Sequence, residues 1–232
     1  LPSFYLEQQK KHGRTHLKIH GETCNYRAYS CPHCGASDRD RLYALYLTPW
    51  MLARAQEAET VLVDFAPAKS LSVFIRDFIR LNRVNLRYIT SDLFMAGVEV
   101  KADICDMPVF QADSVDFFIC SHVLEHVADD IKAMAELYRI LKPGGQGILM
   151  VPINLKAVEI DEDPTVTDMG ERWRRFGQDD HVREYSKNGF LARLHEAGFV
   201  VRSYGAKHFG RSSLWRCGIS TQSVLYVVEK PK

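Results

Sequence analysis

Asp92 closes a short apolar segment, residues 87–91, of the kind that forms a buried strand. At the carboxyl end of a parallel strand, an acidic side chain can accept hydrogen bonds from both hydroxyls of a ribose, as in dinucleotide sites. A lone aspartate at this place is more often a solvated cap of the strand. The segments around Asp92 must therefore decide between the two interpretations.

The segment 122–126, His-Val-Leu-Glu-His, matches the H-x-x-E-H signature of inverted zinc metallopeptidases. On a helix, its two histidines would share a Zn2+ and Glu125 would be the general base. The motif follows a buried strand at residues 117–120, however, and so falls at the sheet edge where ligands bind. We therefore favour a role in which one histidine lines a pocket and the other satisfies a buried polar contact.

A Cys-x-x-Cys turn at residues 31–34 has the form of a zinc knuckle, in which two thiolates reach one ion. Two upstream residues are expected to complete the site. The predicted metal ligands are His20, Cys24, Cys31 and Cys34. His16 or His12 would replace Cys24 if that thiol faced away, and a lost upstream pair or a turn without metal are the alternatives. Redox catalysis is less expected, because no thioredoxin-like strand precedes the turn.

The unit from Ser114 to Pro152 predicts a strand, a helix, a glycine turn and a second strand. After the apolar run 117–120, apolar residues recur at steps of three and four from Val123 to Leu141, which predicts an amphipathic helix. The Lys-Pro-Gly-Gly segment at 142–145 ends that helix. A crossover of this length favours two parallel strands, with ligands beyond their carboxyl ends.

The remaining segments extend this unit into a Rossmann-like α/β fold. We expect a seven-stranded, mostly parallel sheet with helices on both faces. The other expected strands are 60–65, 87–91, 98–102, 199–204 and 224–229, and the other expected helices are 41–55, one capped by Ser70 and one capped by Ser186.

Two boundaries divide the chain. Residues 1–40 predict a small Cys/His-rich appendage resembling a zinc knuckle, and residues 41–232 predict the main domain. Within the main domain, residues 153–185 are charged and irregular, and a loop of this length suggests a function.

Composition bounds the protein class. The chain has 232 residues, with 30 Lys and Arg against 29 Asp and Glu, so no large basic field indicates nucleic acid, although a local patch stays open. No apolar run approaches the roughly 20 residues that span a bilayer, and no signal peptide precedes the first charges. We therefore expect a cytoplasmic protein whose six cysteines are mostly reduced.

Four motifs follow one another along the chain: 62–70, Asp92, 102–108, and 116–120 with 143–145. In this order and spacing they resemble the motifs of class I S-adenosylmethionine (SAM) methyltransferases of the type 11 kind. The resemblance is strong from Val61 to Pro152 and weak elsewhere. A bacterial subgroup of the family has a similar Phe-Ala-Pro turn in its first motif.

The resemblance implies a SAM site on the strand ends. It makes Asp64 the acidic residue of the first motif, places Asp103 against the adenine amino group and packs Ile104 on the ring. The cofactor-binding residues that it implies are Asp64, Phe65, Ala66, Pro67, Asp92, Leu93, Asp103, Ile104, Ser121 and His122.

The first motif departs from the family at three positions. Ala66, Ala68 and Ser70 stand where the family has glycines, which adopt positive φ and let the backbone approach the methionine part of the cofactor. Their absence predicts a differently shaped turn, stiffened by Pro67.

The resemblance also places the 153–185 insertion over the methyl end of the cofactor, where the family builds its acceptor pocket. We expect Trp173 or Phe176 to cover the acceptor and His181 to act as a general base, a role suited to a pKa near neutrality. The alternatives are a solvated charged loop, and a His181 that orients the helix capped by Ser186.

The function implied is methyl transfer from SAM to an oxygen or nitrogen atom of a small molecule, glycan or lipid head group. No Asn-Pro-Pro-Tyr-like element follows the strand at 117–120, which disfavours exocyclic amino groups of nucleobases. An RNA acceptor is the first alternative, gripped by the appendage through Lys10, Lys11, Arg14 and Lys18. A binding protein on a degenerate methyltransferase fold is the second.

Overall fold

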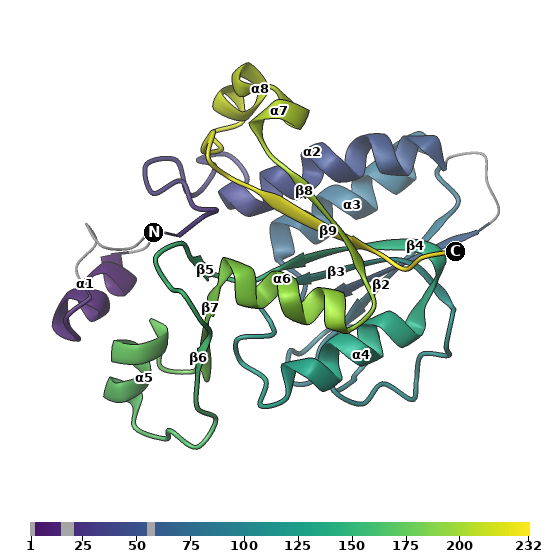
Figure 1. The fold of residues 1–232 in the computed structure, drawn as a ribbon. Coiled ribbons are helices and arrows are strands. Elements are labelled where there is room, and N and C mark those ends of the chain that lie inside the picture. The colour runs from purple at the N-terminus through teal and green to yellow at the C-terminus, as the bar shows by residue number, and fades with distance from the viewer. Residues whose placement is uncertain (1–2, 15–20, 55–58) are drawn as a thin grey trace.

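The computed structural model describes residues 3–14, 21–54 and 59–232. Its centre is a six-stranded sheet in the order β2-β1-β3-β4-β9-β8 (Figure 1). The strands are β1 (Thr60–Phe65), β2 (Leu86–Ser91), β3 (Val115–Ser121), β4 (Leu141–Met150), β8 (Val200–Tyr204) and β9 (Leu225–Glu229). The first four are parallel, and β9 runs antiparallel to β4 and β8. The carboxyl ends of four neighbouring strands therefore meet at one edge.

Helices cover both faces of this sheet. In Figure 1, α2 and α3 lie on one face and α4 and α6 on the other. The helices are α1 (Ser3–Lys11), α2 (Asp38–Ala53), α3 (Lys69–Asn82), α4 (Asp130–Ile140), α5 (Met169–Phe176), α6 (Lys187–Glu196), α7 (Ala206–Phe209) and α8 (Arg211–Arg216). None of these described helices combines the length and the apolar character needed to cross a membrane.

The 153–185 segment carries secondary structure of its own. It contributes β5 (Ile153–Asn154), β6 (Asp161–Glu162) and β7 (Arg183–Ser186) to a second sheet in the order β5-β7-β6, and it also contains α5. The prediction of an irregular segment was wrong in this respect. Asp168 caps α5 by accepting a hydrogen bond from the Glu171 amide, and Gly177 ends it in the left-handed conformation.

The main sheet has six strands in the described residues, where the sequence predicted seven. The expected strand at 98–102 is reduced to a single parallel bridge between Ser91 and Val100. Side chains replace the rest of the ladder, because the Thr90 amide donates to the Glu99 carboxylate at 3.1 Å and the Glu99 amide to the Thr90 hydroxyl at 3.2 Å.

Two helix starts differ from prediction. The helix expected from Val123 begins at Asp130, with Asp129 as its cap, so residues 122–126 form turns. The helix expected to be capped by Ser70 begins at Lys69, with Ala68 at the N-cap position. Ser70 does not cap it, because its hydroxyl donates to the Cys34 carbonyl at 3.1 Å. The helix cap predicted at Ser186 is confirmed.

The core is densest where β3 meets β4. Phe117 and Phe118 are fully buried, and the Phe118 ring lies over Gly147 of β4, the residue paired with it in register. A Cβ atom at position 147 would stand 2.5 Å from the Phe118 ring. Glycine is therefore required there by the close approach of an aromatic ring.

We predict that Gly147→Ala lowers the free energy of unfolding by ~1–3 kcal/mol, because the added methyl group forces the Phe118 ring out of its packed position. Urea denaturation measures this change. Gly205→Ala is the matched control, since a Cβ there meets only the Ser223 carbonyl at 3.6 Å and its φ is negative. Equal stability of the two variants would contradict the prediction.

Candidate functional site

Two cavities adjoin at the carboxyl edge of the parallel strands. The smaller, of about 300 Å3, lies at the ends of β1 and β3. The larger, of about 500 Å3, lies between the N-terminal segment and the 153–185 segment. Tyr29, Arg39 and His122 line both of them. Two ligands bound in these cavities would therefore be neighbours.

Asp64 forms the floor of the smaller cavity. Its side chain is buried, and the Tyr88 hydroxyl donates to its Oδ2 at 2.6 Å. Burial raises the pKa of Asp64 to about 7, although the hydrogen bond from Tyr88 opposes the shift. The carboxylate is therefore poised to receive a cation, which would stabilise its charged form.

The turn after β1 keeps the conformation that glycine favours. Ala66 has a φ of 52°, in the left-handed region, and its amide donates to the Ser91 carbonyl at 2.9 Å. An alanine in this region costs roughly 1–2 kcal/mol. The prediction of a differently shaped turn was thus wrong at Ala66, because the Ser91 hydrogen bond holds the backbone there without glycine.

The structure brings half of the predicted cofactor residues to the smaller cavity. Those that line it are Asp64, Phe65, Ala66, Ser121 and His122. Those that line neither of the two cavities are Pro67, Asp92, Leu93, Asp103 and Ile104. Their roles remain predictions.

Asp92 and Asp103 hold turns of their own backbone. Asp92 Oδ1 accepts hydrogen bonds from the amides of Phe94 and Met95, both at 2.6 Å. Asp103 Oδ1 accepts one from the Cys105 amide at 2.9 Å. Leu93 is exposed beside Asp92, and Ile104 is buried beside Asp103. Each aspartate therefore stabilises a loop that follows the strand edge, whatever else it binds.

Sequence reasoning missed, among other residues of the smaller cavity, Tyr29, Arg39 and Tyr43. The Arg39 guanidinium donates to the Tyr29 hydroxyl at 3.2 Å, and no carboxylate of a described residue forms an ion pair with it. The Tyr43 and Ser121 hydroxyls lie 2.7 Å apart. One signal was available: Ser37 and Asp40 form a capping box that starts α2, and it brings Arg39 to the sheet edge.

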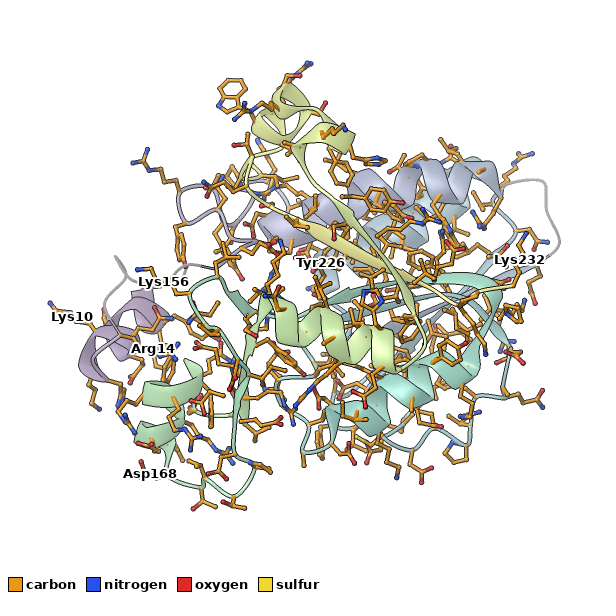
Figure 2. All side chains as sticks on the ribbon, viewed as in Figure 1. Lys10, Arg14, Lys156, Asp168, Tyr226 and Lys232 are labelled. Atoms are coloured by element: carbon orange, nitrogen blue, oxygen red, sulfur yellow. The ribbon has the colours of Figure 1, made fainter. Side chains whose placement is uncertain are left out.

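The N-terminal segment forms a wall of the larger cavity. Arg14 lies between α1 and α5 (Figure 2), where it pairs with Glu184 at 2.7 Å and donates to the Arg174 carbonyl. Glu22 is buried and pairs with Lys187 at 2.6 Å. Arg14 and Glu22 therefore tie the described part of the N-terminal segment to β7 and to the start of α6.

Trp173 and Phe176 have different positions. Trp173 is buried against α1, with its ring stacked on His12 at a centroid distance of 6.2 Å. Trp173 does not line the larger cavity, whereas Phe176 does. Of the two aromatic residues predicted to cover the acceptor, Phe176 alone lines the larger cavity. Its role as a cover stays a prediction.

Four ionisable side chains meet in the larger cavity: His122, Glu125, His126 and His181. His122 Nδ1 lies 3.2 Å and His126 Nε2 4.0 Å from Glu125 Oε1. His181 is buried, and its ring stands edge-on to that of His126 at 4.7 Å. The metallopeptidase interpretation requires His122 and His126 on one face of a helix. Residues 122–126 are not helical, so this requirement is not met.

The charges of this cluster follow from burial. Burial lowers the pKa of His122 to about 4, and it also lowers the pKa of His181. Burial raises the pKa of Glu125, but the neighbouring histidines outweigh it and bring that pKa to about 2. Burial also acts to lower the pKa of His126, but Asp180 and Glu125 outweigh it and raise that pKa. At neutral pH, Glu125 is therefore an anion and His122 is uncharged.

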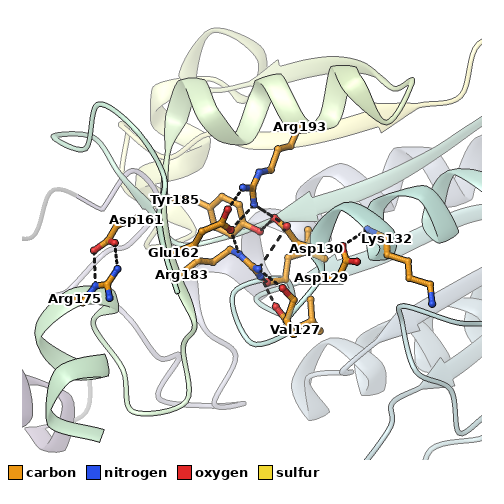
Figure 3. A network of polar contacts seen from close by, with 12 residues as sticks. Val127, Asp129, Asp130, Lys132, Asp161, Glu162, Arg175, Arg183, Tyr185 and Arg193 are labelled. Carbon is orange, nitrogen blue, oxygen red and sulfur yellow. Dashed lines mark hydrogen bonds and ion pairs between the residues drawn. The ribbon is translucent and has the colours of Figure 1, made fainter. Parts of the chain in front are cut away.

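Arg183 of β7 shapes the turn that carries Glu125 and His126 (Figure 3). Its guanidinium donates to the carbonyl oxygens of Leu124 and Val127, both at 2.5 Å, and of Ala128 at 2.8 Å. These carbonyls would accept helical hydrogen bonds if the helix began at Val123. The Arg183 guanidinium takes the place of the helical amide donors, so this segment stays a turn.

The predicted zinc ligands are not brought together. His20 lies outside the described residues. Backbone and side-chain hydrogen bonds around Cys34 and His33 lower the pKa of Cys31, which places these residues in one tight turn. Cys24 is half-buried, burial raises its pKa to about 11, and it does not join Cys31 and Cys34 in a group of possible metal ligands. The described residues give the zinc prediction no support.

The comparison with protein families identifies the domain. A family model described as a methyltransferase domain matches residues 34–149, half of the chain. The chain belongs to this methyltransferase domain family. No curated protein matches the sequence.

Solved structures share the fold of this methyltransferase domain. It is similar to the CurJ carbon methyltransferase, with 15% identity and a TM-score of 0.55 over 83% of this chain and 54% of that chain. It is also similar to the [4+2]-cyclase SpnF, with 13% identity and a TM-score of 0.54 over 99% and 94% of the two chains. The chain thus spans about half the length of the CurJ structure.

A third structure is phosphoethanolamine N-methyltransferase 2 of Haemonchus contortus in complex with SAM, with 12% identity and a TM-score of 0.48 over 81% of this chain and 53% of that one. Because the matching chains include both methyltransferases and a cyclase, the shared fold does not specify the reaction. The reaction must be argued from the cavities.

We predict that Asp64 makes the protein less stable as the pH rises from 3.8 to about 7. Its folded-state pKa lies above its ordinary value, so in this window the folded protein holds a proton that the unfolded chain releases. Stability contributed by this group is lost at ~1.4 kcal/mol per pH unit.

Urea denaturation of the native protein and of Asp64→Asn across this pH window isolates the effect, because other titrating groups cancel in the difference. Tyr88→Phe removes a hydrogen bond that favours the charged form, and it should move the window to higher pH. A difference between native protein and Asp64→Asn that does not change with pH would refute the assignment.

Proposed function

We propose that the protein transfers a methyl group from SAM, bound in the smaller cavity, to an oxygen or nitrogen atom of a small acceptor in the larger cavity. The observation that carries this proposal is the contact between the cavities, which share Tyr29, Arg39 and His122. A methyl donor and its acceptor must lie in line and in contact, and two adjoining cavities satisfy that requirement.

The residues of the smaller cavity fit SAM chemically. SAM carries an ammonium group and a carboxylate on its methionine part. The Asp64 carboxylate suits the ammonium group, and the Arg39 guanidinium suits the carboxylate. The left-handed backbone at Ala66 supports the fit, because it preserves the turn that lets a ligand approach β1 closely. When bound, SAM supplies an electrophilic methyl group on its sulfonium.

The protein's own residues would position and enclose the reactants. Asp64 and Arg39, which both line the smaller cavity, would hold the methionine part. Tyr43 and Ser121, joined by their hydroxyls at 2.7 Å, form a polar wall at the end of β3. The N-terminal segment, anchored through Glu22 and Arg14, forms one wall of the larger cavity.

The size and walls of the larger cavity favour a small acceptor. A cavity of about 500 Å3 falls within the ordinary range for small-molecule sites. Arg14, one of the cations expected to contact an RNA backbone, is instead paired with Glu184. A small metabolite, a glycan or a lipid head group is therefore the acceptor class that we propose. His181 as a general base remains a prediction.

Isothermal titration calorimetry with SAM and with S-adenosylhomocysteine tests cofactor binding. We predict that Arg39→Gln weakens SAM binding by ~1.5–3 kcal/mol, because a charge-assisted hydrogen bond to the SAM carboxylate is lost. Arg27→Gln, an exposed arginine of the same segment, is the control and should bind SAM like the native protein. Absence of heat with both ligands would favour a binding protein on a degenerate fold.

Asp92 gives a second prediction for the same titration. If its carboxylate holds the ribose, Asp92→Ala should weaken SAM binding by ~1.5–3 kcal/mol. Asp92→Asn separates this role from turn stabilisation, because its amide oxygen can still accept the Phe94 and Met95 amides. Weaker binding in both variants supports ribose binding, whereas a loss confined to Asp92→Ala identifies a turn cap.

A further inference from the structure

Glu125 is a buried carboxylate without a hydrogen-bond partner. Its side chain is 1% exposed, and neither Oε1 nor Oε2 accepts a hydrogen bond from any described residue. It nevertheless lines the larger cavity. A buried carboxylate without a hydrogen-bond partner calls for an explanation, and a bound ion is one such explanation.

The ion-pair partners of Glu125 within the described chain are histidines alone. They are His122 and His126, with nitrogen to oxygen distances of 3.2 and 4.0 Å. Arg183 donates to backbone carbonyls and to Glu162 instead. Glu125 therefore keeps oxygen lone pairs that a ligand in the larger cavity can use.

Three ligand-type atoms converge beside this carboxylate. One atom each from Glu125, His126 and His181 lies within 4.8 Å of the others. Ligands about 2.1 Å from a zinc ion in a tetrahedron are roughly 3.4 Å apart, so small side-chain rotations bring this group to coordination distance. Two of the three residues come from the 122–126 turn, and the third comes from the end of the 153–185 segment.

In His126 and in His181, the Nδ1 atom contacts a residue outside the proposed ligand group. His126 Nδ1 lies 3.3 Å from Asp180 Oδ2, and His181 Nδ1 lies 3.1 Å from the Phe176 carbonyl. A proton on each Nδ1 satisfies these acceptors and leaves the Nε2 lone pair free. Histidines that bind metals almost always donate their other ring N–H to a carboxylate or a backbone carbonyl.

We propose that Glu125, His126 and His181 bind a divalent transition-metal ion in the larger cavity. Two imidazoles and one carboxylate suit zinc and iron, whereas calcium and magnesium prefer sites made of oxygen atoms. Three protein ligands leave open positions for water or another ligand, as in catalytic metal sites. The bound cation would be the partner that the Glu125 carboxylate oxygens lack among the described residues.

The surroundings make this site rigid before metal arrives. Arg183 donates to three carbonyl oxygens of the turn between β3 and α4. In the same turn, the Glu125 carbonyl accepts a hydrogen bond at 2.9 Å from the amide of Val182, the residue before β7. His122 stands next to Oε1 and orients the carboxylate. Ligands held in this way lose little conformational freedom on binding.

The metal site deepens the proposed function and, in its consequence for the reaction, rests on it. An acceptor hydroxyl in the larger cavity would occupy an open position of the ion, which lowers the pKa of a bound hydroxyl. His181 would then be a metal ligand and not a general base. Metal binding itself does not require methyl transfer, so the two proposals can fail separately.

The test begins with a variant that removes the rival thiolate site. Metal-free Cys31→Ser protein is titrated with Zn2+ by calorimetry and with Co2+ by visible spectroscopy. We expect one equivalent of either ion, with Co2+ d–d bands but no thiolate charge-transfer band, because all ligands are nitrogen and oxygen. Thiolate bands, or no binding of either ion, would overturn the proposal.

Substitutions in the same background assign the ligands. Glu125→Gln and His126→Asn should abolish stoichiometric binding, and Asp180→Asn should weaken it by about 10–100-fold through the lost partner of His126. His195→Asn is the matched control, because His195 Nδ1 also contacts a backbone carbonyl, that of Phe199 at 3.2 Å, but belongs to no ligand group. Unchanged affinity in Glu125→Gln would rule out the site.

Two further measurements test the proposal without any substitution in the cluster, in case a variant fails to fold. Long-range proton–nitrogen NMR spectra of native protein with Zn2+ should show changes at the Nε2 atoms of two histidines, without any substitution in the cluster. SAM calorimetry on the metal-free protein is independent of the ion. A protein that binds SAM but no Zn2+ would leave the proposed function and remove the metal site, and a protein that binds Zn2+ but no SAM would do the opposite.

Discussion

The candidate site depends on one buried cation, the guanidinium of Arg183. Arg183 is 2% exposed, and it holds three backbone carbonyls of the turn after β3 while its Nε pairs with Glu162 at 3.1 Å. Arg193 completes the network by bridging Asp130 and Glu162 (Figure 3). A charge buried so deeply is tolerated only because every donor finds an oxygen. The turn at 122–126, the start of α4 and the second sheet are thereby set relative to one another.

This arrangement unites parts of the chain that are far apart in sequence. The smaller cavity is built on the parallel strands and closed by the start of α2, whereas the larger one is walled by the N-terminal segment and by the second sheet. Arg39 lines both, which makes α2 the link between them. The catalytic possibilities of the protein therefore arise where the common fold meets two segments that lie mostly outside the matched family region.

Strand and helix periodicity predicted most of the main sheet, because a buried parallel strand and an amphipathic helix leave opposite patterns in the sequence. The errors fall where side chains replace backbone partners. Glu99 and Thr90 reduce an expected strand to one bridge, and Arg183 removes a turn of helix before Asp130. Side chains that replace backbone hydrogen-bond partners leave no periodic signal, since such contacts do not depend on a regular spacing of residue types.

The sequence by itself determined the methyltransferase-like order of strands and motifs, and with it the edge where ligands bind, because both are set by local patterns. It also identified Asp64, Ser121, His122 and His181 as site candidates through their places in those patterns. Only the tertiary structure decided that Arg39 and Tyr29 join the smaller cavity and that Glu125, His126 and His181 converge in the larger one. The reason is physical: these residues meet through packing and buried charge across long stretches of chain, and neither leaves a trace in residue spacing.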